Sequence, residues 1–204
     1  MKIKTTSIFD NKINALYKKI MKTTFYIVRH GQTIFNLNGR IQGQSDSPLT
    51  KKGQEQARLM AEKIKDIEFI LGVSSTSERA RDTLLTIANQ RFPCHFYKDL
   101  KEIGFGTLEG ESIEYMKDTS RRDWTEYGGE TFDQAAKRVE KRLCVLSENI
   151  GNRNILVVSH GAVIREVLHD LEPSFYDIMP NCSMCILVCE DGKLSVQSLP
   201  EVLI

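Results

Sequence analysis

Apolar runs and amphipathic stretches alternate along most of the chain. Short runs rich in β-branched and aromatic residues are typical of strands buried on both faces of a sheet. Such runs lie at 25–28, 69–73, 92–97 and 155–158. Apolar residues recur at helical spacing over 57–67, 80–88 and 132–146, and from about Ala162. Strands that alternate with helices predict an α/β fold, a three-layer αβα sandwich with a mostly parallel central sheet and helices on both faces.

Local signals mark where several of these elements begin or turn. Ser77 is a candidate N-cap of the helix that follows it, and Thr131 with Gln134 makes a capping-box pattern. Two further apolar runs within 184–198 flank Asp191-Gly192, which is a strong turn pair. We therefore expect the chain to close with a β-hairpin, whose outer edge offers a place where a second copy pairs in a homodimer.

Two of the apolar runs end in the same way. The run at 25–28 continues into Arg29-His30-Gly31, and the run at 155–158 continues into Ser159-His160-Gly161. Ligands of open α/β sheets bind just beyond the carboxyl ends of the strands. Two histidines delivered to that edge, one beside an arginine, predict an anion site. The alternative is a pair of core histidines with no ligand.

Charge excludes some classes of partner. The chain has 204 residues and a formal net charge of +1, from 28 basic and 27 acidic residues. This balance gives no electrostatic footprint for nucleic acid or for an anionic membrane surface, and no apolar stretch is long enough to span a bilayer. We therefore expect neither nucleic acid nor membrane as a partner.

The first 21 residues differ from the rest of the chain. They carry scattered lysines and lack the continuous apolar stretch and cleavage site of a signal peptide. Four of their apolar residues recur at the spacing of a short amphipathic helix: Ile13, Leu16, Tyr17 and Ile20. We expect residues 1–21 to be an N-terminal extension and residues 22–204 to form a single catalytic domain.

The cysteines bear on the compartment and on metal binding. There are five, an odd number, which without a signal peptide predicts free thiols in a reducing, cytoplasmic setting. Cys182, Cys185 and Cys189 have a spacing that suggests a metal site. In a strand, however, Cys185 and Cys189 share a face that Cys182 does not, and no histidine lies nearby to complete a tetrahedral set. We expect buried thiols there and no metal.

Four elements, in this order along the chain, resemble the histidine phosphatase superfamily, the phosphoglycerate-mutase-like group. They are Arg29-His30-Gly31 after a strand with Asn36 seven residues on from Arg29, Arg79 within 74–80, Glu102 in Leu100-Lys101-Glu102, and Ser159-His160-Gly161. The resemblance covers residues 22–199, nearly the whole chain. It implies the three-layer fold already expected and a phosphoryl-transfer site.

The chemistry of these residue types suits that implied site. His30 is the candidate nucleophile, with one ring nitrogen attacking phosphorus while the other donates a hydrogen bond that holds the tautomer. Arg29 and Arg79 offer guanidinium donors to the phosphoryl oxygens, and we expect a protonated His160 to add charge. Glu102 is the candidate proton donor to the leaving oxygen and later the base that activates water.

The substrate-binding residues that we expect extend this set. They are Arg29, Gly31, Asn36, Gln42, Gly43, Arg79, Glu102, His160 and Gly161. No metal or organic cofactor is implied, because a two-metal phosphatase needs clustered carboxylates and histidines. The expected partner is a small-molecule phosphate monoester.

Two branches of the family are compatible with the motifs. The loop at 40–50 and Gly128-Gly129-Glu130-Thr131 before a helix resemble the phosphatase branch, and the lysine that mutases carry after Gly110 is missing. Arg121-Arg122 lies near where mutases use paired arginines; the alternative is an exposed basic helix face. We predict a metal-independent phosphatase of small metabolites that works through a phosphohistidine on His30. The other hypotheses are a cofactor-dependent phosphoglycerate mutase and a catalytically silent phosphate-binding protein.

The irregular region at 103–129 is expected to cover the site and to decide the substrate. Its aromatic residues, among them Phe105, Tyr115, Trp124 and Tyr127, either pack on the leaving group or form a satellite core. Lys117, with the arginine pair, is a candidate reader of a carboxylate or a second phosphate. The motifs do not choose among sugar phosphates, phosphoglycerates, phosphoserine, cofactor precursors and phosphoproteins.

Overall fold

A computed structural model describes residues 22–116, 121–177 and 179–202. Six strands form one sheet: β1 (Lys22–Arg29), β2 (Leu71–Ser75), β3 (Cys94–Tyr97), β4 (Asn154–Ser159), β5 (Met184–Glu190) and β6 (Lys193–Glu201). Their order is β3-β2-β4-β1-β5-β6. The first four in that order are parallel, and the C-terminal hairpin adds β5 and β6 antiparallel. The predicted extension and Lys117 lie outside the described residues.

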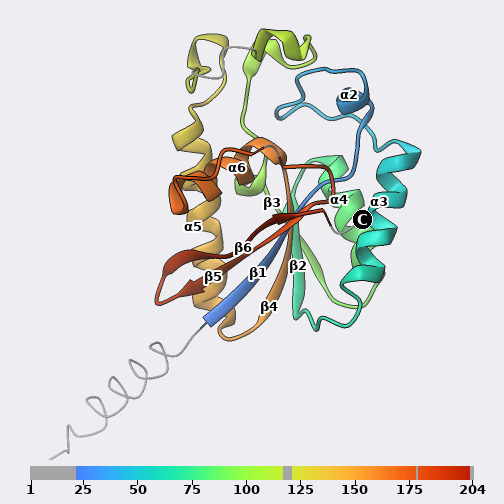
Figure 1. Ribbon diagram of the computed structural model, residues 1–204, viewed down its shortest axis with the longest axis vertical. Coiled ribbons are helices and arrows are strands. Elements are labelled where there is room, and N and C mark those ends of the chain that lie inside the picture. The colour runs from blue at the N-terminus through green and yellow to red at the C-terminus, as the bar shows by residue number, and fades with distance from the viewer. Residues whose placement is uncertain (1–21, 117–120, 178, 203–204) are drawn as a thin grey trace, which may run out of the picture.

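Helices cover both faces of the sheet, so the three-layer α/β prediction is confirmed. The longer ones are α3 (Lys51–Lys63), α4 (Glu78–Ala88), α5 (Phe132–Ile150) and α6 (Gly161–Leu171). Figure 1 shows α3 and α4 on one side of the sheet and α5 with α6 on the other. Shorter helices are α2 (Ile34–Leu37), η1 (Lys98–Leu100), η2 (Gly106–Leu108), η3 (Ile113–Met116) and η4 (Thr125–Tyr127).

Side chains of the central strands pack in a separate hydrophobic core on each face of the sheet. On β4, Ile155 and Val157 pack in the cluster beside α5 and α6, whereas Leu156 and Val158 pack in the cluster beside α3 and α4. This division follows from the alternation of side chains along a strand. A continuous apolar run therefore serves both faces, and its polar end residues are left at the sheet edge.

Several boundaries differ from the sequence prediction. The helix predicted over 57–67 ends at Lys63, so Ile67 lies beyond it. Ser77 is the N-cap residue of α4, but its hydroxyl makes no capping hydrogen bond and is buried without a partner. The capping box of Thr131 and Gln134 is formed, with hydrogen bonds of 3.0 and 3.1 Å.

Between β3 and α5, the described residues form short 3₁₀ helices but no α-helix. Phe105 and Trp124 are buried and belong to the core cluster beside α5, whereas Tyr115 is exposed. The rings of Phe105 and Trp124 meet edge to face with their centroids 5.3 Å apart. Phe105 and Trp124 are therefore part of a main core cluster rather than a satellite core, and they also line the cavity described below. Packing on the leaving group stays a prediction.

The cysteine prediction is confirmed for the C-terminal trio, whose three thiols are buried and free. Burial raises the pKa of Cys185 to about 12, so this thiol is inert at neutral pH. Among the described side chains, no three histidines, cysteines or acids gather as a metal site requires. Within the same residues, no helix has the length and apolar character needed to cross a membrane.

Candidate active site

The site lies where β1 and β4 end side by side. Arg29 pairs with Ser159 in the parallel register, and the His30 N–H donates to the Ser159 carbonyl at 3.0 Å. The next residue of each strand end is a histidine, and the two imidazole centroids lie 5.2 Å apart. Parallel pairing of two similar runs thus brings together residues that are 130 positions apart in sequence.

The His30 ring is fixed in one tautomer. Its Nδ1 lies 2.8 Å from the Gly31 carbonyl oxygen, which only accepts, so Nδ1 carries the proton. The Nε2 atom accepts from Arg79 Nε at 3.3 Å. Burial, with the nearby charges of Arg79 and Arg29, holds the pKa of His30 well below its usual range. The imidazole is therefore neutral and lines the cavity, with its Nε2 lone pair engaged by Arg79 in the free site.

Arg79 is fully buried, so it is not an ordinary surface arginine. Its Nη1 donates to the Ser45 carbonyl at 2.7 Å and to Asp46 at 3.0 Å, and its Nη2 donates to the Gly43 carbonyl at 2.6 Å. These bonds tie the loop after α2 to the first turn of α4. The guanidinium is thus rigid before any ligand arrives.

Arg29 is the last residue of β1 and precedes His30 in the chain. Its Nη1 donates to the Met179 carbonyl, and its Nε is buried without a partner. Burial lowers the pKa of Arg29, while Glu102 acts in the opposite direction. A Cβ at Gly161 would lie 2.9 Å from the Arg29 Nε, so glycine is what lets this guanidinium lie against the start of α6.

His160 differs from its expected state. Its Nε2 lies 2.7 Å from the Ser75 hydroxyl, and its Nδ1 is buried without a partner. Burial, then Arg79 and His30, lower the pKa of His160 well below its usual range. The protonated His160 that we expected is therefore not the form favoured in the free site, although a phosphate dianion nearby would favour it. His160 is fully buried and is not among the residues that line the cavity.

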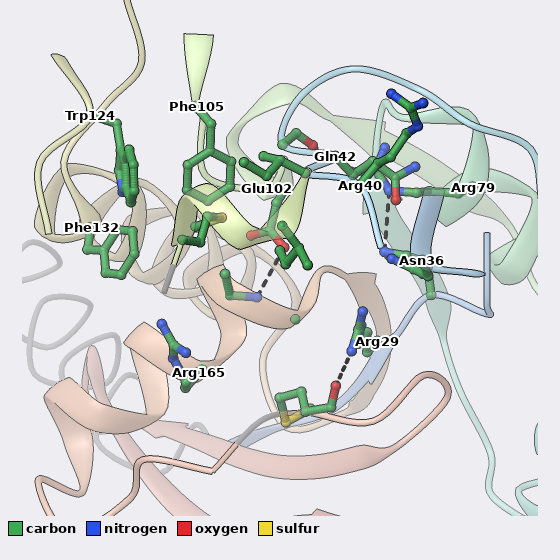
Figure 2. A pocket seen from close by; sticks show the side chains of 18 of the residues that line it. Arg29, Asn36, Arg40, Gln42, Arg79, Glu102, Phe105, Trp124, Phe132 and Arg165 are labelled. Atoms are coloured by element: carbon green, nitrogen blue, oxygen red, sulfur yellow. Dashed lines mark hydrogen bonds between the residues drawn. The ribbon is translucent and has the colours of Figure 1, made fainter. Parts of the chain in front are cut away.

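Glu102 is held by the N-terminus of α6. Its Oε2 accepts from the Ala162 N–H at 3.0 Å, and its Oε1 accepts from the Val163 N–H at 2.8 Å. A third bond comes from the Ile103 N–H at 3.0 Å. These backbone donors fix the direction of the carboxylate, which lines the cavity, as Figure 2 shows.

Neutral donors complete the phosphoryl end. The Asn36 Oδ1 accepts from the Thr33 N–H at 3.2 Å and from Asn181 Nδ2 at 3.2 Å, which leaves the Asn36 NH₂ for the cavity. The Gln42 Oε1 accepts from Thr33 at 3.0 Å, and its Nε2 is buried without a partner. Both amides therefore have their acceptor atoms occupied, and no described residue accepts from their NH₂ groups.

Glycines allow close approaches around the site. Gly31 does not line the cavity, in contrast to its predicted role; its N–H donates to Thr83 at 3.1 Å, and a Cβ there would lie 2.4 Å from the Gly53 carbonyl oxygen. Gly43 does line the cavity, with φ +53° and no room for a side chain beside Glu109. Gly31 thus allows close packing against Gly53, and its carbonyl fixes the tautomer of His30.

Several residues that hold this site were not predicted from the sequence. Glu109 accepts hydrogen bonds from Gln44, Ser45 and Phe105, and so binds the loop after α2 to the covering region. Asp46 pairs with Arg79, whose Nε contacts His30. No sequence motif marks them, because their role depends on loop conformation.

The paired arginines are not on a helix face. Arg121 lines the cavity and makes an ion pair with Glu126, while Arg122 donates to Glu166 at 2.5 Å. The alternative of an exposed basic helix is therefore wrong in its local structure. The two side chains also diverge, since only Arg121 reaches the cavity.

The site opens into a cavity of about 490 Å³. Figure 2 shows Arg29, Arg79 and Asn36 at one end. The other end is formed by aromatic side chains and a further arginine, namely Phe105, Trp124, Phe132 and Arg165. Glu102 lies between the two ends. We call these the phosphoryl end and the leaving-group end. The first is polar and buried, and the second has apolar walls.

Comparison with known proteins places the chain in a family. The model of the histidine phosphatase superfamily (branch 1) matches residues 25–201. A metal-independent phosphoserine phosphatase of Arabidopsis thaliana is 33% identical over 88% of this chain and 82% of that protein. A phosphoglycerate mutase of Bacillus anthracis has a TM-score of 0.81 at 29% identity, covering 89% of this chain and 94% of that one. A phosphoserine phosphatase of Entamoeba histolytica, in complex with phosphoserine, has a TM-score of 0.73 at 27% identity, covering 86% and 95%. The chain therefore belongs to the histidine phosphatase superfamily.

Proposed function

We infer that this protein is a metal-independent phosphatase that hydrolyses phosphate monoesters of small metabolites through a phosphohistidine on His30. The observation that carries this inference is the His30 ring itself. It is neutral and oriented by the Gly31 carbonyl, and its Nε2 contacts the buried Arg79 with the half-buried Arg29 nearby. This arrangement has the nucleophile and the charge stabilisation that phosphoryl transfer needs before substrate binds.

In the first step the Nε2 lone pair forms a bond to phosphorus as the ester P–O bond breaks. Arg29, Arg79 and the amide donors hold the equatorial oxygens, and the departing oxygen takes a proton from Glu102. The Gly31 carbonyl stabilises the imidazolium character that develops at Nδ1. The products of this step are the free alcohol and phospho-His30.

In the second step a water attacks phosphorus and loses its proton to Glu102. The P–N bond breaks, its electron pair returns to Nε2, and inorganic phosphate leaves. Glu102 thus returns to the protonation state in which it began. No metal ion is required, because the arginines supply the positive charge that a metal would otherwise provide.

Mutase activity is the second candidate, because the chain is similar in structure to a protein named as a phosphoglycerate mutase. A mutase has to hold a second substrate group firmly while excluding water. Arg121 is already engaged by the Glu126 carboxylate and the Tyr127 hydroxyl, and Arg122 by Glu166. This engagement supports the phosphatase.

The test is a phosphorus NMR time course with EDTA present on a pool of metabolite monoesters. The pool includes 3-phosphoglycerate with a trace of 2,3-bisphosphoglycerate, and the His30→Ala protein is the blank. We expect inorganic phosphate to grow only with the wild-type protein. Growth of 2-phosphoglycerate with little free phosphate would replace this proposal with a mutase, and no turnover would leave a silent phosphate-binding protein.

A further inference from the structure

The cavity holds more positive charge than one phosphoryl group accounts for. Five arginines and two glutamates line it. Arg29 and Arg79 serve the phosphoryl end, so three remain: Arg40, Arg121 and Arg165. These three differ in how far their guanidinium groups are already occupied by the protein.

Arg121 and Arg40 are poorly placed to bind a ligand. All three nitrogens of the Arg121 guanidinium contact the protein, namely the Asp123 carbonyl, the Tyr127 hydroxyl and the Glu126 carboxylate. Arg40 donates to a backbone carbonyl at 2.6 Å, and Figure 2 shows its guanidinium turned away from Glu102. Arg165 is the remaining cation.

Arg165 is held by one edge and open at the other. Its Nε and Nη2 donate to the Glu166 Oε1 at 3.1 and 2.8 Å, and no described residue accepts from Nη1. Arg165 lies three residues beyond Ala162, whose N–H binds Glu102, so both residues are on the same face of α6. Figure 2 shows that side chain below Phe132, at the leaving-group end.

Glu166 fixes the direction of this guanidinium. Its side chain is 3% exposed, and its Oε2 accepts from Arg122 at 2.5 Å. The Cζ atoms of Arg122 and Arg165 lie 5.3 and 5.8 Å from the Phe132 ring centroid. A buried carboxylate requires such partners. Two arginines and one glutamate leave this cluster with a net charge of +1.

We propose that Arg165 binds a carboxylate on the leaving group, so that the substrates are phosphorylated small carboxylic acids; this rests on the phosphatase proposed above. A planar guanidinium edge matches a carboxylate. The net +1 of the cluster balances one carboxylate but not a second phosphate dianion. Phe105, Trp124 and Phe132 enclose this end and strengthen the pairing by excluding water. Arg165 is thus a specificity-determining residue, and Glu166 is a positioning residue.

Two substrates that differ only in the carboxylate test this proposal. O-phosphoserine and O-phosphoethanolamine share the ester and the amine. We expect wild-type kcat/KM to favour phosphoserine by about tenfold to a hundredfold, the range for a hydrogen bond to a charged group. Arg165→Gln should bring that ratio close to one, chiefly by raising the KM for phosphoserine, and Arg165→Lys should restore part of it.

Arg142→Gln is the matched control. Arg142 also pairs with a carboxylate, Asp99, and lies 4.5 Å from the Tyr97 ring centroid, yet it does not line the cavity. We expect it to keep the wild-type ratio. Turnover of phosphoethanolamine by Arg165→Gln shows in the same assay that the variant is folded.

The outcomes separate this inference from the proposed activity. Equal loss on both substrates in Arg165→Gln, or no preference in the wild type, would overturn the carboxylate assignment. An Arg165-dependent preference for 1,3-propanediol bisphosphate over phosphoserine would also overturn it. If the wild type releases phosphate from neither ester, the phosphatase proposal is decided by the monoester pool described above. Calorimetric binding of the two compounds to wild type and Arg165→Gln then decides the carboxylate question alone, with equal affinities contradicting it.

Discussion

The phosphoryl end and the leaving-group end of the cavity are built from different kinds of structure. The phosphoryl end comes from strand ends and helix starts, where backbone hydrogen bonds of the sheet fix His30 and where Arg79 is fully buried. The leaving-group end comes from the irregular region before α5 and from the middle of α6. The difference separates chemistry from selectivity: changes at the first end should affect every ester alike, and changes at the second should alter the ranking of esters.

Removal of the nucleophile is expected to have the largest effect and tests the phosphoryl end directly. His30→Ala should lower kcat on the order of 10⁴-fold or more, because no other group then forms the covalent intermediate. The loss should be equal for phosphoserine and phosphoethanolamine. The measurement is steady-state phosphate release, with the exposed His95→Ala as control. A loss that depended on the ester would break the separation of the two ends.

Glu102 lies between the two ends, and its substitution tests whether it donates the proton to the leaving group. Glu102→Gln keeps the shape and removes the proton transfer, so kcat should fall by about 10²–10⁴-fold for alkyl esters. The loss should be much smaller for the first turnover of p-nitrophenyl phosphate, whose leaving group needs no proton. Pre-steady-state absorbance of p-nitrophenol measures this. An equal loss on both ester types in that first turnover would remove Glu102 from its acid role.

The rigidity of the phosphoryl end depends on close backbone packing. Gly31→Ala places a Cβ 2.4 Å from the Gly53 carbonyl oxygen, so β1 or α3 has to move, at a cost of about 1–3 kcal/mol in unfolding free energy. Urea unfolding of this variant and of Gly104→Ala makes the comparison, since the nearest atom to a Cβ at Gly104 is a flexible side-chain nitrogen at 3.3 Å. Equal stability of the two variants would contradict the account of Gly31.

The pH dependence of stability tests the charge state of the two buried histidines. Burial and neighbouring arginines keep the pKa values of His30 and His160 well below their usual range in the folded protein. The unfolded chain therefore binds more protons below about pH 6.5, so stability is complete above that pH and is lost as the pH falls. Each histidine contributes at most about 1.4 kcal/mol per pH unit.

Urea midpoints between pH 7.5 and pH 5 test this sign. His160→Gln should flatten the decline, whereas His95→Gln should leave it unchanged because His95 is exposed. Stability that rises as the pH falls through this range would contradict the neutral state of the two buried imidazoles.

Sequence predicted the phosphoryl end far better than the leaving-group end, and the reason is physical. Two buried runs that each end in histidine have to meet if they pair in parallel, so His30 and His160 follow from periodicity and topology. The charge state of His160 did not follow, because it depends on burial and on the surrounding arginines. Arg165 was not predicted from the sequence, because its role depends on lying on the same face of α6 as Ala162. It also depends on a cavity formed by segments that are distant in sequence.

The most direct test of the central claim is to trap the covalent intermediate. Wild-type protein mixed with p-nitrophenyl phosphate in EDTA is quenched in alkali within the first turnover, and the peptide that contains His30 is examined by mass spectrometry. The account predicts one phosphoryl group on His30, formed at the rate of the p-nitrophenol burst. Phosphate release without phospho-His30, or with the phosphoryl group on His160, would contradict it.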